Sequence, residues 1–181
     1  MSITWTGRPE ADRLLETDPL ALLIGLVLDQ QVKMEKAFSG PYELRQRLGH
    51  LDAERIAGMD PDRLAAVFRE RPALHRFPGS MAKRVQQLCQ AVAADYGGAA
   101  DRIWQEVASG EELKKRIGGL PGFGDQKTKI TLAVLAKKFG VKPEGWERYA
   151  ADWHTVADVD SPESMVQARE VKRRMKAEGR A

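Results

Sequence analysis

The stretch LKKRIGGLPGFGDQKTKITLAVLAKKFG, residues 113–140, decides the fold of this chain. Residues 113–117 read as the end of a short helix, which Gly118 and Gly119 stop before a tight turn over residues 120–124. From residue 125 to residue 139 apolar side chains recur at helical spacing, which predicts an amphipathic helix that Gly140 caps in a left-handed conformation. We therefore expect two helices joined by a glycine-rich hairpin.

The hairpin has the features of a site that binds phosphate. Gly122 and Gly124 let the backbone approach a ligand closely because no side chain stands in the way. The N–H groups that open the second helix attract an anion, and the helix dipole reinforces that attraction. Lys127 and Lys129 follow at once, at a helix end where cations are favourable beside a bound anion. The pattern favours contact with a DNA backbone phosphate over the alternative, a purely structural hairpin.

The composition sets outer limits on the class of protein. The 181 residues include 29 Lys and Arg and 26 Asp and Glu, and the resulting net charge of +3 does not by itself indicate a nucleic-acid partner. The single cysteine, Cys89, excludes an intramolecular disulfide and favours a reducing compartment. The N-terminus lacks the order of a secretory signal, and the longest apolar run, residues 20–28, is too short to cross a bilayer. We therefore expect a cytoplasmic protein without a membrane partner.

Helical signals account for nearly all of the chain. Asp18 is a good N-cap and Pro19 suits the first helical position, so a helix that is apolar on all sides is expected over residues 19–32. Ser80 is expected to cap a long helix over residues 81–96, which Gly97 ends. The other expected helices cover residues 9–16, 34–38, 42–48, 53–58, 61–69 and 162–178, with a break at residues 39–41 and irregular chain over residues 141–160.

The hairpin resembles the helix-hairpin-helix of the endonuclease III superfamily of base-excision DNA glycosylases, also written HhH-GPD. The family hairpin reads Leu-Pro-Gly-hydrophobic-Gly, and residues 120–124 match it at every position. DPLALLIGLVLDQQ, residues 18–31, looks like the family's early core helix, and residues 80–98 look like the helix that follows its DNA wedge. The resemblance is good over residues 18–140 and poor elsewhere. It implies an all-α fold of two helical lobes, with a cleft that holds a flipped base.

The resemblance implies DNA contacts on two further segments. Gln31 aligns with a glutamine that fills the gap left by an extruded base, and Phe77 falls in the loop that wedges into the duplex. From the residues alone, Gln31 fits a role of satisfying backbone groups at a helix end equally well, and a loop phenylalanine more often packs in a core. The implied DNA-binding residues are Gly122, Gly124, Gln126, Lys127, Lys129, Gln31 and Phe77.

The family resemblance also implies a catalytic aspartate, because cleavage of a glycosidic bond needs a carboxylate beside the anomeric carbon. In the family it lies about twenty residues beyond the hairpin, in a Val-Asp-Thr-His context that opens the next helix. That offset falls on Glu144 here, whereas the matching context is Val159-Asp160-Ser161. Asp160 is therefore the first candidate, Asp158 the second and Glu144 a distant third. The alternative for Asp160 is that it only assists a helix N-terminus.

The same resemblance bears on strand cleavage and on cofactors. Bifunctional family members use a lysine just after the hairpin to form a Schiff base with the sugar. Gln126 occupies that position, and Lys127 is turned away from it by about 100° on a helix, so we expect a monofunctional enzyme with Lys127 on a phosphate. One cysteine cannot supply the four-cysteine iron–sulfur cluster of many relatives. A K⁺ or Na⁺ ion is implied on the backbone carbonyls of Gly118, Leu120 and Phe123.

These expectations describe an enzyme that excises a damaged or mismatched base from double-stranded DNA and acts as a monomer associated with the nucleoid. Residues 1–181 are expected to form one unit of this type. Within it we expect a helical lobe over residues 18–112, the helix-hairpin-helix over residues 113–140, and a C-terminal loop and basic helix over residues 141–181. Two alternatives remain: a non-catalytic helix-hairpin-helix module that recognises distorted DNA, and a protein-interaction scaffold that keeps the fold.

Overall fold

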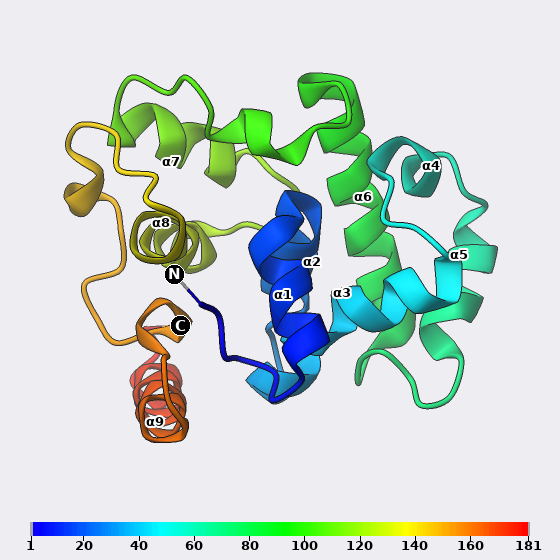
Figure 1. Ribbon diagram of the computed structural model, residues 1–181, viewed down its shortest axis with the longest axis horizontal. Coiled ribbons are helices and arrows are strands. Elements are labelled where there is room, and N and C mark those ends of the chain that lie inside the picture. Colours follow the sequence, from blue (N-terminus) through cyan, green and yellow to red (C-terminus); the bar gives the residue numbers. More distant parts are fainter. Residues whose placement is uncertain (1, 181) are drawn as a thin grey trace. The chain divides into compact units, whose positions relative to one another are not determined.

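A computed structural model describes residues 2–180 of the chain (Figure 1). Within that range it contains nine α-helices, three short 3-10 helices and no β-strand, so the expected all-α fold is confirmed. The residues group into two compact units. The larger unit comprises Thr6–Ile103 together with Leu120–Gly122, and the smaller comprises residues 2–5, 104–119 and 123–180.

The larger unit is built around one buried helix. Its helices are α1 (Pro9–Thr17), α2 (Pro19–Leu28), α3 (Met34–Leu48), α4 (Ala53–Ala57), α5 (Pro61–Arg69) and α6 (Pro78–Tyr96), followed by the 3-10 helix η1 (Ala100–Ile103). Every residue of α2 after Pro19 is buried, and α2 packs against α1, α3, α6 and η1. The Asp18 carboxylate caps it by accepting bonds from the N–H groups of Leu20 and Ala21, at 2.9 and 3.3 Å. The expectation of an all-round apolar core helix with this cap is confirmed.

Helix α2 ends earlier than expected, at Leu28 instead of residue 32. The backbone leaves the helix because Gln30 N–H bonds to the Leu28 carbonyl at 2.7 Å and Gln31 adopts a left-handed conformation with φ 55°. The Leu28 carbonyl also accepts a bond from the ring of His75, at 3.1 Å. A contact from far along the chain therefore helps to set the end of this helix.

The expected break at residues 39–41 is wrong, because α3 runs through it with Pro41 inside. A proline within a helix costs about 3 kcal/mol compared with alanine. Here Phe38, Gly40, Pro41 and Leu44 are all buried, and a Cβ on Gly40 would collide with the Leu28 side chain. Close packing of α3 against α2 offsets the local preference of the sequence.

The start of α6 also differs from the expectation. The helix begins at Pro78, in the first helical position, after Phe77 as an N-cap that makes no side-chain bond, so Ser80 lies inside the helix and is not its cap. Its end is as expected, with Gly97 in a left-handed conformation at φ 61°. The side chains of Asp52 and Asp60 cap the starts of α4 and α5, which begin where the sequence predicts.

The smaller unit carries α7 (Gly110–Gly118), α8 (Asp125–Phe139), the 3-10 helices η2 (Trp146–Arg148) and η3 (Val156–Asp158), and α9 (Pro162–Ala177). Helix α8 has the expected bounds, and Gly140 caps it at φ 69°. It is less amphipathic than expected, because residues 131–136 are all buried where α7 and η3 pack on it. Helix α9 starts as predicted, with Ser161 in a capping box.

Across residues 2–180, every helix is either too short or too polar to span a bilayer.

Candidate functional site

The two glycines of the hairpin between α7 and α8 differ in whether the fold requires them. Gly122 has φ +88°, a conformation that other residues rarely adopt, and the space around it holds only an ordinary contact with Val27. Gly124 has an ordinary φ of −72°, and a Cβ placed on it would meet nothing within 4 Å. The protein itself therefore has a structural need for glycine at Gly122 but not at Gly124.

The start of α8 presents backbone donors together with charged side chains. Gly124 is its N-cap and makes no side-chain cap bond. Lys129 Nζ lies 3.2 Å from Asp125 Oδ2 in an ion pair whose acid is largely exposed. Exposed pairs of this kind contribute little free energy, so Lys129 exchanges partners readily. Lys127 and Gln126 are half-buried in the same turn.

The carbonyl of Phe123, one of the three expected to hold a monovalent cation, lies 3.4 Å from the Thr128 hydroxyl, which donates to it. A carbonyl oxygen has two lone pairs, so this bond leaves one for an ion. The K⁺ or Na⁺ ion expected on the carbonyls of Gly118, Leu120 and Phe123 stays a prediction.

The two residues expected to contact an extruded base lie in the larger unit. Gln31 is exposed, and it is a non-glycine residue in the left-handed region. Phe77 is 39% exposed, which is unusual for a large apolar side chain, and the guanidinium of Arg76 lies 5.3 Å from the centre of its ring. The exposure of Phe77 disfavours the alternative in which it packs in the core.

The three candidate carboxylates differ in what already binds them. Asp158 is committed to the local structure, because its Oδ1 accepts from Lys137 Nζ at 2.5 Å and its Oδ2 accepts from Thr155 N–H at 2.9 Å. Asp160 is exposed just before α9, and its Oδ1 accepts from the Ser164 hydroxyl at 3.1 Å. Glu144 is also exposed, on the loop whose backbone pairs with Ser109. Asp160 is therefore the carboxylate that is both held in place and open to solvent.

A buried lysine holds the chain immediately before Asp160. Lys138 is only 6% exposed, and its ammonium donates to the Val159 carbonyl at 2.9 Å. Burial lowers the pKa of Lys138, while Asp160 and Asp158 act in the opposite direction. Sequence reasoning missed this residue because a lysine in the last turn of a helix ordinarily lies in solvent and complements the helix dipole.

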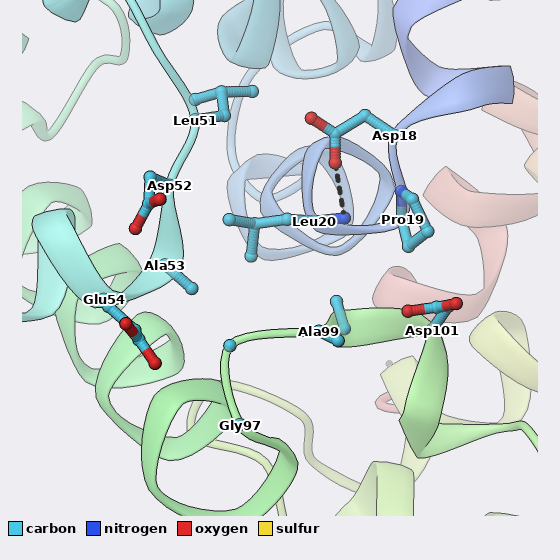
Figure 2. A pocket seen from close by; sticks show the side chains of 12 residues that line it. Asp18, Pro19, Leu20, Leu51, Asp52, Ala53, Glu54, Gly97, Ala99 and Asp101 are labelled. Atoms are coloured by element: carbon cyan, nitrogen blue, oxygen red, sulfur yellow. Dashed lines mark hydrogen bonds between the residues drawn. The ribbon is translucent and has the colours of Figure 1, made fainter.

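A cavity of about 350 Å³ lies at the N-terminal end of α2, in the larger unit (Figure 2). Gln31 follows the opposite end of that helix. The Asp18 and Asp52 carboxylates are the N-caps of α2 and α4, and burial raises the pKa of Asp18 above its ordinary value. Carboxylates repel phosphate, so the lining of this cavity is unfavourable for contact with a DNA backbone. The acidic side chains that line it are Asp18, Asp52, Glu54 and Asp101.

The sequence matches the family described as HhH-GPD superfamily base excision DNA repair protein over residues 24–175. Curated proteins give no significant match. The matched range extends past residue 140, where motif resemblance alone is poor, and it includes the hairpin, Gln31, Phe77 and the segment that carries Asp158 and Asp160. Because the match covers most of the chain, the protein belongs to the HhH-GPD superfamily of base excision DNA repair proteins.

Proposed function

We propose that this protein is a monofunctional DNA glycosylase, which binds duplex DNA as a monomer and cleaves the N-glycosidic bond of a flipped damaged or mismatched base. The observation that carries the proposal is that the Asp160 carboxylate is both exposed and hydrogen-bonded. Its carboxylate is exposed at the start of α9, and both its Oδ1 and its backbone N–H bond to the Ser164 hydroxyl, at 3.1 and 2.9 Å. This is a fixed carboxylate that a nucleotide can reach.

Such a carboxylate suits the chemistry of base excision. As the bond from base to sugar breaks, positive charge develops on the sugar, and a nearby anion stabilises it or activates a water molecule. The positive end of the α9 dipole also attracts a carboxylate that lies beside it. Asp158 suits this role less well, because Lys137 and the Thr155 N–H occupy its two oxygens. We therefore assign the catalytic role to Asp160.

The hairpin supplies the proposed contact with the DNA backbone. Gly124 opens α8 without a side-chain cap and without steric need for glycine, so a phosphate has room beside its N–H group. Lys127 and Lys129 add positive charge in the same turn. Phosphate contacts of this kind position the duplex without reading its sequence.

The presence of Gln126 is the reason for proposing that the protein does not cleave the DNA strand. A Schiff base requires an amine nucleophile, which a glutamine cannot provide. Gln126 stands in the position where bifunctional relatives carry their lysine, and Lys127 lies about 100° further around the helix. Release of the base should therefore leave an intact strand with an abasic site.

The test is a panel of duplexes that each carry one damaged or mismatched base, incubated with the protein and analysed with and without hot alkali. Strand breaks that appear only after alkali on at least one duplex are expected. Borohydride added during the reaction should trap no protein–DNA adduct. Breaks without alkali, or an adduct that is lost in Lys127→Ala, would show that the protein is bifunctional.

The same panel separates the two alternatives. Binding to duplex DNA without any excision would favour a non-catalytic module that recognises distorted DNA. Failure to bind any duplex would favour a protein-interaction scaffold.

A further inference from the structure

We infer that His75 is a positioning residue, whose imidazole ties the Gln31 turn to the Phe77 loop so that both side chains meet DNA as one rigid wedge. The inference rests on the proposed function, since it concerns how the protein fills the space of an extruded base. All of the residues involved lie in the larger unit.

Both nitrogens of the His75 ring are used, and their partners fix the proton. The Nε2 atom lies 3.1 Å from the Leu28 carbonyl and 3.0 Å from the Gln30 carbonyl. Carbonyl oxygens only accept, so Nε2 carries the hydrogen. The Nδ1 atom accepts from the Phe77 N–H at 3.0 Å and must therefore be bare. The ring is thus a neutral imidazole that joins two segments distant in sequence.

The His75 ring bonds to the backbone at or next to both candidate DNA-contact residues, Phe77 and Gln31. His75 is 1% exposed, so neighbouring atoms hold it in a single position. One bond fixes the carbonyl of Gln30, the residue directly before Gln31, and another fixes the backbone of Phe77 itself. Gln31 has the strained φ of 55°, and conformations of this kind persist only when the surrounding structure imposes them. His75 provides part of that restraint.

A second set of bonds secures the same turn. The Gln30 side-chain amide donates to the Val27 carbonyl at 2.8 Å, and its oxygen accepts from Arg84 of α6 at 2.7 Å. Helix α6 begins directly after Phe77. The turn and the loop are therefore joined twice, once through the buried ring and once through an exposed side-chain pair.

The experiment compares two substitutions, each of which replaces the hydrogen-bonding group of only one ring nitrogen. Gln places an amide near Nε2, so His75→Gln retains a donor for the carbonyls of Leu28 and Gln30. Asn places an oxygen near Nδ1, so His75→Asn retains only an acceptor for the Phe77 N–H. The matched control is His50→Asn, because His50 makes the same local bond, with Asp52 N–H donating to Nδ1 at 3.0 Å.

Dissociation constants are measured for a duplex with an abasic-site analogue and for the matched intact duplex, alongside thermal unfolding. We expect His75→Asn to lower the preference for the abasic duplex by about tenfold. His75→Gln should retain most of that preference, and His50→Asn should retain all of it. Adding Gln31→Ala to His75→Asn should produce little further loss, because both changes remove the same interaction. Full additivity, or a parental preference in a folded His75→Asn variant, would overturn the inference.

Backbone hydrogen exchange without DNA separates failure of this inference from failure of the proposed function. His75→Asn should raise the exchange rate at residues 29–31, and His50→Asn should not. If the parent protein excises no base from any duplex of the panel, the proposed function fails. Unchanged exchange at residues 29–31 overturns the role of His75 whatever the DNA result. If His75→Asn does not fold, exchange is measured on His75→Gln, where the Phe77 N–H should exchange faster because its acceptor is lost, while residues 29–31 stay protected. Parental exchange at Phe77, or faster exchange at residues 29–31, would contradict the inference.

Discussion

Cys89 lies on the inner face of α6, where its thiol is completely buried. Burial raises the pKa of this thiol from 9.0 to about 12, and the charge of Asp52 adds to the effect. The unfolded chain therefore releases the thiol proton at a lower pH than the folded protein does. The stabilising contribution is complete below pH 9 and is lost as the pH rises from 9 towards 12.

Because the pKa of the Cys89 thiol is higher in the folded protein, this side chain should lower the stability of the protein at alkaline pH. At pH 10.5 the free energy of unfolding should have fallen by about 2 kcal/mol on account of Cys89. Cys89→Ala should be less stable at neutral pH, because it leaves a small cavity, but its stability should decline less between pH 9 and 10.5. Urea unfolding of both proteins at several pH values provides the measurement. Parallel pH profiles for the two proteins would contradict the raised pKa.

The position of Lys138 leads us to expect that its substitution slows excision without weakening DNA binding. Its ammonium holds the Val159 carbonyl at 2.9 Å, next to the proposed catalytic residue Asp160. Lys138→Met removes that bond and also removes a charge whose burial is unfavourable, so the change in stability should be small. Excision should fall by about tenfold or more, because a small displacement of a catalytic group slows the reaction.

Single-turnover excision and binding to an abasic duplex are the two measurements for Lys138→Met. Binding should be unchanged, and Lys138→Arg should restore part of the rate because a guanidinium also donates to a carbonyl. Equal losses in binding and excision would indicate a general loss of structure instead.

At the scale of elements, the hairpin allows DNA binding to be separated from folding. Gly124 is the N-cap of α8, has an ordinary φ and has open space beside it. Asp is one of the best N-cap residues, so Gly124→Asp should fold normally and should stabilise α8 by roughly 0.5–1 kcal/mol. The same carboxylate would repel a phosphate at this position, so affinity for all duplexes should fall alike.

Gly124→Ser is the matched control, because it supplies a cap without a charge. It should bind DNA better than Gly124→Asp at similar stability. The binding of Gly124→Asp should also depend less steeply on salt, by a slope of about one phosphate contact. Parental affinity in a folded Gly124→Asp protein would show that no phosphate lies at this hairpin.

Most helix limits set by a local cap were predictable from the sequence, and those set by distant contacts were not. Ser80 is the exception among the local signals, because α6 already begins at Pro78. Asp18 and Gly140 mark the ends of their helices as expected, because a cap acts on its own helix. Pro41 misled the prediction of α3, because its cost is offset by packing on α2. The early end of α2 was missed because part of its cause is His75, which lies 47 residues from Leu28.

At the scale of the whole molecule, the family could be inferred from the hairpin motif, and the match over residues 24–175 confirms it. The candidate site was only partly predictable. The sequence ranked Asp160 before Asp158, and the structure adds that Lys137 and the Thr155 N–H already bond to the carboxylate of Asp158. Lys138 escaped notice because its burial arises from the packing of η3 on α8, which no local pattern reveals.

In the proposed function, the catalytic role in base excision belongs to Asp160. The most direct test of this role is single-turnover excision, measured with the parent protein, Asp160→Asn and Asp158→Asn on a duplex that the parent processes. The amide keeps the shape of the carboxylate but removes the charge that acts in the transition state.

Asp160→Asn should bind that duplex at least as tightly as the parent while excising at a rate lower by about 10³-fold or more. Asp158→Asn should lose much less activity, in line with a structural role. Excision by Asp160→Asn at the parental rate, with Asp158→Asn or Glu144→Gln inactive, would contradict the assignment.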